Sequence, residues 1–295
     1  MNILITGATG LIGSHLTSQL IKHAHGVTAL VRDPKAAKQT LPASVTLISS
    51  LAQYTTLDTF DAVINLAGEP IFEKRWTAQQ KQRLVESRVN LTAQLVQRIN
   101  ASRTPPHTFI SGSATGYYGH NAEEIITENA PATDTFPSQL CQRWESEALC
   151  AKTRVCLLRT GIVLSKTGGA LAKMLPLYRL GLGGKLGSGK QYWAWIALDD
   201  MVKGILFLLE NHQCQGAFNL VSPNPVRHVE FNNTLANILK RPAFATVPEL
   251  LLRFFLGERA QLLLDSQKIV PEKLLAQGFV FDYPELKSAL QAILK

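Results

Sequence analysis

Three glycines near the start of the chain, Gly7, Gly10 and Gly13, follow one another at a spacing of three residues. They come after an apolar stretch, Asn2 to Ile5, that predicts a buried strand, and before an amphipathic stretch that predicts a helix to about His23. In this order the glycines permit a tight turn, the approach of a pyrophosphate, and close packing of helix on sheet. The start of a helix adds unpaired N–H groups and a positive dipole end. The dinucleotide cradle predicted here consists of Gly7, Thr9, Gly10, Leu11, Ile12 and Gly13.

The second predicted strand, Val27 to Val31, ends in Arg32 and Asp33. In folds of this kind the loop after the second strand contacts the adenine ribose. An acidic residue there accepts from the 2′-hydroxyl of NAD, whereas an arginine suits the 2′-phosphate of NADP. Because Arg32 comes first, we expect NADP, while Asp33 keeps NAD open. The alternative is that Arg32 is an ordinary surface cation.

Later predicted strands also end in small or hydroxyl residues; these strands are Asp61–Asn65, His107–Ser111 and Arg154–Arg159. Ligands bind at the carboxyl ends of the strands of open parallel sheets. Ser113 and the adjacent tyrosines, Tyr117 and Tyr118, are therefore site candidates, unless this loop merely packs. Further residues expected beside the cofactor are Leu66, Ala67, Gly68, Glu69, Arg159, Gly161, Ile162 and Val163.

Strands and helices alternate through the first half of the chain, which predicts an α/β fold with a doubly wound parallel sheet of the Rossmann type. We expect residues 1–165 to form this domain, with 193–221 returning to it. Residues 166–192 and 222–295 then form a smaller, mostly helical substrate-side region, with a C-terminal helical module at about 247–295. The glycine-rich stretch Lys166–Lys190 is expected to be mobile, and Asp199 with Asp200 is expected to cap a helix.

The composition is that of an ordinary globular protein: 295 residues, 46% hydrophobic and 18% charged, with a net charge of +8. The positive charge forms no basic run, so we expect no nucleic-acid partner. No apolar stretch is long enough for a membrane span, and we expect no signal peptide, because the first predicted strand begins at Asn2. The four cysteines show no metal-type or disulfide spacing. We therefore expect a cytoplasmic monomer or homodimer without a metal or a membrane partner.

These features resemble the extended short-chain dehydrogenase/reductase superfamily and, more closely, its sugar-nucleotide epimerase-like subgroup. The resemblance covers the whole chain, and from about Val247 it includes a C-terminal module of unknown function. The stretches that carry it, besides the glycine turn, are Asn65–Gly68, Ser113–Gly119, Leu158–Leu164, Gly168–Leu171, Trp195–Asp200 and Asn219–Val226.

The resemblance implies a serine and a Tyr-x-x-x-Lys pair that together move a proton to or from the reacting oxygen. Ser113 matches the serine. The glutamate that usually follows the lysine falls on Glu145, which places Cys141 at the lysine and Pro137 at the tyrosine. The asparagine expected in the long helix falls on Arg88. The usual proton relay is therefore absent.

Substitutes for the relay are present nearby. Tyr117 or Tyr118 could donate a proton, and Arg88 could place positive charge near the ribose or the substrate. Cys141 could act as a proton donor or nucleophile if its pKa is lowered, or it could be an inert buried thiol. The catalytic candidates are thus Ser113, Tyr117, Cys141 and Arg88.

Two functions are compatible with this pattern. The first is an NADP-dependent oxidoreductase or epimerase-like enzyme acting on a small polar substrate, which could be linked to a nucleotide. The second is a non-catalytic NADP(H)-binding sensor or interaction protein, suggested by the loss of the Tyr-x-x-x-Lys pair.

Overall fold

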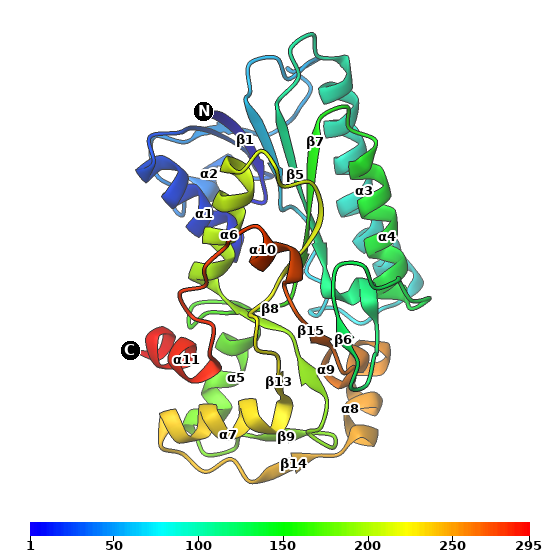
Figure 1. Ribbon diagram of the computed structural model, residues 1–295, viewed down its shortest axis with the longest axis vertical. Coiled ribbons are helices and arrows are strands. Elements are labelled where there is room, and N and C mark those ends of the chain that lie inside the picture. The colour runs from blue at the N-terminus through cyan, green and yellow to red at the C-terminus, as the bar shows by residue number, and fades with distance from the viewer.

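The computed structural model describes all residues, 1–295, and is organised around one seven-stranded sheet in which every neighbouring pair is parallel (Figure 1). The strands lie in the order β3-β2-β1-β4-β5-β7-β12. Their bounds are β1 Asn2–Thr6, β2 Gly26–Leu30, β3 Thr46–Ile48, β4 Ala62–Asn65, β5 Thr108–Ala114, β7 Arg154–Thr160 and β12 Gly216–Leu220. The order reverses beside β1, as in doubly wound sheets, so the predicted fold class is confirmed.

Helices cover both faces of this sheet (Figure 1). One face packs on α1 (Leu11–Lys22) and α6 (Leu198–Glu210), with the short α2 (Pro34–Ala37) beside them. The other face packs on α3 (Ala78–Ala101) and α4 (Phe136–Leu149). Alternate residues of β1 supply the two cores: Ile3 and Ile5 face α1, and Leu4 faces α3. Burial on both faces explains why these strands read as continuous apolar runs.

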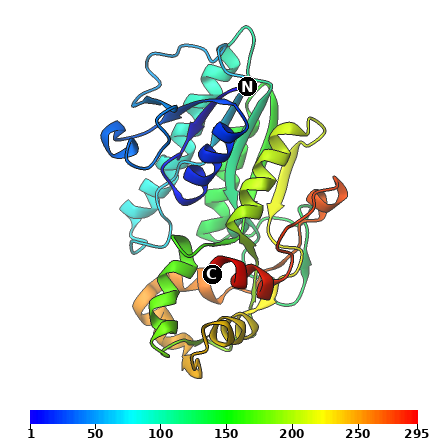
Figure 2. The same cartoon turned by 90° about the vertical axis from the view of Figure 1, so that its left-hand side faces the viewer.

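A smaller region lies at the carboxyl end of the sheet (Figure 2). Its helices are α5 Gly169–Arg179, α7 His228–Leu239, α8 Glu249–Leu256, α9 Gln261–Leu264 and α11 Leu286–Leu294, with the 3-10 turn η2 Gly257–Ala260. The short α10, Glu272–Ala276, instead packs on β12, and its Leu274 joins the core of the main sheet. Its strands form two-stranded pairs: β8 Ile162–Leu164 with β11 Trp195–Ala197, β9 Gly184–Leu186 with β14 Ala245–Val247, β10 Tyr192–Trp193 with β13 Val226–Arg227, and β6 Ile125–Ile126 with β15 Lys268–Ile269. Trp193, Trp195 and Phe231 anchor its core.

The glycine-rich stretch 166–190, which was expected to be mobile, contains α5 and β9. The structure differs from the sequence prediction just beyond it. Asp199 and Asp200 do not cap α6, which begins one residue earlier at Leu198. The buried carboxylate of Asp200 instead accepts the backbone N–H groups of Asp282 and Tyr283, at 2.8 and 2.9 Å. It therefore fixes the chain segment that leads into α11.

None of the helices combines the length and the apolar character that crossing a bilayer requires.

Candidate functional site

The turn between β1 and α1 requires glycine, because a side chain at either of two positions would collide with the protein backbone. Gly7 has a φ of +72°, and a Cβ there would lie 2.6 Å from the backbone carbon of Leu66. A Cβ on Gly13 would lie 2.1 Å from the carbonyl oxygen of Gly7. Gly10 precedes α1, and no side chain caps the helix, so its first N–H groups are free to bind an anion. The turn has the properties of a pyrophosphate cradle.

A buried polar network supports this turn. Thr6 donates its hydroxyl hydrogen to Asn65 Oδ1 at 2.6 Å, and accepts the backbone N–H of Ala67 at 3.2 Å. Asn65 in turn donates to the Thr92 hydroxyl on α3 at 2.8 Å. Thr6, Asn65 and Thr92 are fully buried, so every polar atom must find a partner inside the protein. The network joins the ends of β1 and β4, and it places Leu66 and Ala67 against Gly7.

In the loop after β2, Arg32 and Asp33 have different hydrogen-bonding environments. Asp33 is the N-cap of α2, and its carboxylate accepts the N–H groups of Lys35 and Ala36 at 2.9 and 3.1 Å. Both N–H groups bond the same oxygen, Oδ1, so the carboxylate is held at the start of α2 as its cap. Arg32 is exposed and makes no hydrogen bond or ion pair within the chain. The free group at the end of β2 is the guanidinium.

Arg32 also lies on the side of the β4 loop. The pKa of Glu69 is lowered chiefly by a hydrogen bond from Lys74, whose Nζ is 2.9 Å away, and further by the charges of Lys74 and Arg32. Strands β2 and β4 pair with β1 on its two sides, so the loops that follow them lie on either side of the glycine turn.

Arg88 projects from α3 onto the β4 loop. Its Nη2 donates to the Glu69 carbonyl at 2.9 Å, and its Nη1 donates to the Leu84 carbonyl at 3.1 Å. A Cβ on Gly68 would lie 2.9 Å from Arg88 Cζ, and the guanidinium also lies 5.3 Å from the Trp144 ring. Burial lowers the pKa of Arg88. These contacts fix a positive charge against Gly68, where the sequence predicted cofactor contact.

Ser113, Glu145 and Arg159 form a buried chain of hydrogen bonds. The Ser113 hydroxyl donates to Glu145 Oε1 at 2.5 Å. The same carboxylate receives Arg159 Nε at 2.9 Å and Nη2 at 2.8 Å, a two-point contact. All three side chains are almost completely buried. Ser113 and Arg159 are register partners on β5 and β7, so both point from the same face of the sheet toward α4.

The hydrogen bond to Glu145 restricts what the Ser113 hydroxyl can do for a ligand. A hydroxyl has one hydrogen to donate, and here Glu145 receives it. Ser113 can offer a ligand its lone pairs, but it cannot polarise a reacting oxygen as a donor while this bond persists.

The guanidinium of Arg159, a residue predicted to lie beside the cofactor, is bound within the protein. Besides Glu145, the group donates through Nη1 to the Tyr118 hydroxyl at 2.8 Å and to the Glu128 carbonyl at 3.1 Å. The pKa of Arg159 is raised by the hydrogen bonds and charge of Glu145, which outweigh the opposing effect of burial. The side chain therefore stabilises the interior as a permanent cation.

The two adjacent tyrosines differ in their environments. Tyr118 is fully buried, donates its hydroxyl hydrogen to Asn219 Oδ1 at 2.7 Å, and burial raises its pKa to about 12. Tyr117 is half-buried, and its ring lies over Arg159, with the guanidinium carbon 3.6 Å from the ring centre. Its hydroxyl makes no hydrogen bond within the chain. Tyr117 is thus the tyrosine whose hydroxyl is free to bind a ligand.

Cys141 does not have the properties of a nucleophile. The thiol is 4% exposed and lies 3.6 Å from the Ala114 carbonyl oxygen. Burial, together with the negative charge of Glu145, raises its pKa to about 11. A thiol with such a pKa stays protonated near neutral pH, so the predicted activation is not supported by the structure.

The stretch Gly161–Val163 follows β7 and bends away from the main sheet. The Ile162 N–H bonds the Ala194 carbonyl at 2.8 Å, and β8 then pairs with β11. Just beyond, a Cβ on Gly168 would lie 3.0 Å from the Leu11 side chain in the first turn of α1. The smaller region therefore lies directly against the first turn of α1.

The doubly wound sheet with an uncapped glycine turn at its switch point defines a Rossmann-type dinucleotide protein. The model of the NAD dependent epimerase/dehydratase family matches residues 3–220, and the chain belongs to that family. Residues 247–293 match a further model, a domain of unknown function called DUF1731, which confirms the predicted C-terminal module.

Individual relatives agree with this assignment. The chain is 37% identical to an Arabidopsis thaliana protein named epimerase family protein SDR39U1 homolog, chloroplastic, over 100% of this chain and 87% of the relative. A crystal structure of the human epimerase family protein SDR39U1 (isoform 2) with NADPH superposes with a TM-score of 0.92 and 34% identity, covering 99% of each chain. A Corynebacterium glutamicum structure described as a nucleoside-diphosphate sugar epimerase is 31% identical, with a TM-score of 0.79 over 100% of this chain and 58% of the other.

Proposed function

We propose that this chain binds NADP(H) at the glycine turn and uses it in an oxidoreductase or epimerase-type reaction on a small polar substrate. The cofactor assignment depends above all on the loop after β2, where Asp33 is occupied as a helix cap while Arg32 is free. The backbone N–H groups at the start of α1 would bind the pyrophosphate, and Arg32 would bind the 2′-phosphate. The human relative crystallised with NADPH supports the same choice. The bound nicotinamide supplies hydride transfer.

The chain's own contribution to a reaction would come from the end of β5. Tyr117 offers a free hydroxyl one turn beyond Ser113, and is the best candidate to hold or move a proton at a substrate oxygen. Ser113 would accept a hydrogen bond from a substrate hydroxyl through its lone pairs. Arg88, held against Gly68, would orient the nicotinamide ribose or an anionic part of the substrate.

A nucleotide-linked substrate is the class that we favour. The support is the name of the Corynebacterium glutamicum relative, which refers to a nucleoside-diphosphate sugar. The test is to incubate the purified chain with NADP(H) and a panel of nucleotide sugars, following nicotinamide absorbance and separating sugar epimers by chromatography. Turnover that disappears in Tyr117→Phe supports the enzymatic proposal. Absence of turnover across the panel, with NADPH binding verified on the same sample, counts against it.

A second function, an NADP(H)-binding sensor, is favoured by one specific observation. Ser113 donates to Glu145, and the Cys141 thiol is buried with a pKa of about 11, so two of the four candidate catalytic groups are not free to act. A sensor would change partners or shape on binding NADPH without converting a substrate. Pull-downs with and without NADPH test this idea, and recovery of the same partners in both would reject it.

A further inference from the structure

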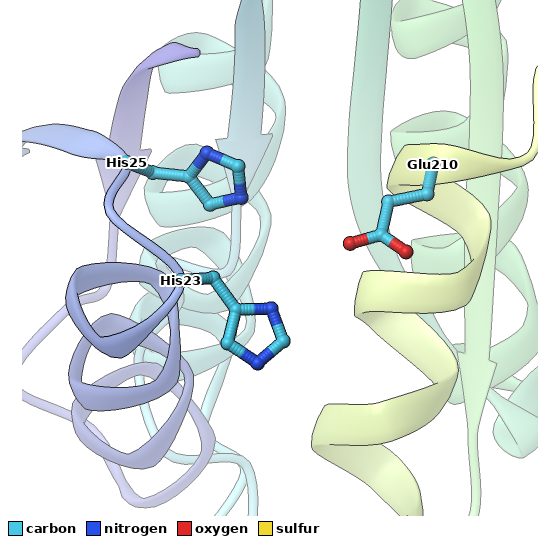
Figure 3. A group of neighbouring side chains, drawn as sticks. All are labelled: His23, His25 and Glu210. Atoms are coloured by element: carbon cyan, nitrogen blue, oxygen red, sulfur yellow. The ribbon is translucent and has the colours of Figure 1, made fainter.

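Two histidines and a glutamate meet at the amino end of the sheet, on the opposite edge from the glycine turn. His23 and His25 lie between α1 and β2, and Glu210 is the last residue of α6. Helices α1 and α6 pack side by side on one face of the sheet, so their ends bring these residues together. Figure 3 shows both imidazole rings directed toward the Glu210 carboxylate.

The way α1 ends fixes the two histidines. Ala24 has a φ of +58°, a left-handed conformation that terminates the helix. Its N–H bonds the Ile21 carbonyl, and the His25 N–H bonds the Leu20 carbonyl, both at 3.0 Å. This pair of bonds is a Schellman motif, which reverses the chain within two residues. The turn therefore places both rings on the same side as α6.

The three side chains have the donors and spacing of a metal site. Each offers one ligand atom, and the three atoms lie within 4.8 Å of one another. Tetrahedral Zn²⁺ with bonds of about 2.0–2.1 Å needs ligand atoms roughly 3.3 Å apart, a distance that small rotations of exposed side chains can reach. Imidazole nitrogen and carboxylate oxygen together suit zinc and neighbouring transition metals better than Mg²⁺ or Ca²⁺.

A second observation points to a ligand in the same place. The Nε2 atom of His25 is buried and has no hydrogen-bond partner in the protein, although buried polar atoms nearly always have one. Its other ring nitrogen, Nδ1, lies 3.3 Å from the Met1 amino group. A metal on Nε2 requires the hydrogen of the neutral ring to be on Nδ1, where it would donate to that amino nitrogen in its uncharged form.

We propose that His23, His25 and Glu210 form a binding site for a divalent transition metal of the zinc class. Three protein ligands leave a fourth position for water. The metal would join the turn between α1 and β2 to the end of α6, and so would stabilise the sheet domain from the edge opposite the cofactor.

The experiment uses the full chain without a histidine tag and with its natural amino terminus, treated with chelator and then titrated with ZnCl₂ by calorimetry. The wild-type chain should bind one Zn²⁺, and its melting temperature should rise with Zn²⁺ concentration. His25→Ala and Glu210→Gln should each weaken Zn²⁺ binding by about tenfold or more, because one protein ligand is lost. Cobalt in place of zinc should give a tetrahedral absorption spectrum in the wild type alone.

The matched control is His212→Ala. His212 pairs with His107, with ring centres 5.1 Å apart, and it should leave Zn²⁺ binding unchanged. Since His23 and Glu210 are exposed, His23→Ala and Glu210→Gln should fold, and they carry the test if His25→Ala does not. Absence of saturable Zn²⁺ binding, binding that survives both of these variants, or binding lost equally in His212→Ala would each overturn the proposal.

Discussion

The candidate site has two parts that differ in whether their hydrogen-bond donors are free. We call the glycine turn with Arg32 the open half, and the cluster of Ser113, Glu145 and Arg159 the closed half. At the glycine turn, hydrogen-bond donors remain open: the first N–H groups of α1 have no side-chain cap, and Arg32 has no partner. At the end of β5, the donors are already taken, since Ser113 and Arg159 give their hydrogens to protein acceptors. This difference indicates that the chain is organised to bind a dinucleotide. A catalysed reaction would have to use the polar side chains that have no protein partner, above all Tyr117.

The largest effect on cofactor binding should come from a side chain added in the glycine turn. Gly13→Ala places a Cβ where the Gly7 carbonyl oxygen lies 2.1 Å away, so α1 must move off the turn. We expect NADPH binding to be lost and stability to fall by about 1–3 kcal/mol. Nicotinamide fluorescence titration and thermal unfolding measure the two effects. A Gly13→Ala chain that binds NADPH as the wild type does would show that the turn is not the cradle.

Removing the ion pair of the closed half should lower the free energy of unfolding more than it lowers the affinity for NADPH. Glu145→Gln leaves the Arg159 cation buried without a counter-charge, which typically costs about 3–5 kcal/mol. Denaturant unfolding should report this loss, while NADPH affinity of the folded chain stays close to that of the wild type. As a control, the double variant Glu145→Met with Arg159→Met removes both charges and should recover much of the stability. Equal losses in the single and double variants would argue against the ion pair.

Substitution of the two neighbouring tyrosines should have different consequences, one for stability and the other for turnover. Tyr118→Phe removes an acceptor of Arg159 and a donor to Asn219, and should destabilise the fold by about 1–3 kcal/mol. Tyr117→Phe should leave stability unchanged, because its hydroxyl has no protein partner, but it should lower any turnover by about 10²–10⁴-fold. Unfolding curves and rates on the same two samples check this. The reverse pattern would exchange the roles assigned to the tyrosines.

The smallest effect concerns thiol reactivity. At pH 8 the buried Cys141, with its pKa raised to about 11, carries only about one thiolate per thousand thiols, whereas Cys150 is exposed. Iodoacetamide followed by mass spectrometry should therefore modify Cys150 and spare Cys141 in the folded chain. Rapid modification of Cys141 would restore it as a candidate nucleophile.

The cofactor half could be predicted from the sequence because its signals are local. A strand, a glycine turn and a helix follow one another within thirteen residues or so, and Arg32 lies directly after the next strand. The interior network could not be predicted in the same way. Arg159 and Ser113 come together through the register of β5 with β7, and Glu145 reaches them from α4. The sequence contained these residues, but their pairing depends on tertiary packing.

The corrections have the same physical origin. Asp200 lies in the first turn of α6, close to where a cap is expected, yet its carboxylate accepts the N–H groups of the distant residues Asp282 and Tyr283. The site formed by His23, His25 and Glu210 depends on the contact between α1 and α6, so it could not be predicted from the spacing of residues in the sequence. Only the alternation His-x-His was a local signal, and by itself it indicated nothing about Glu210.

The central claim is that the open half binds NADP(H), with Arg32 at the 2′-phosphate. The most direct test measures the affinities for NADPH and NADH of the wild-type chain and of Arg32→Ala. Loss of a charge-assisted contact should weaken NADPH binding by about 10–100-fold and leave NADH binding unchanged. Lys35→Ala, in the same loop, should alter neither affinity greatly. An Arg32→Ala chain that retains wild-type NADPH affinity, or that loses affinity for both cofactors equally, would contradict the account.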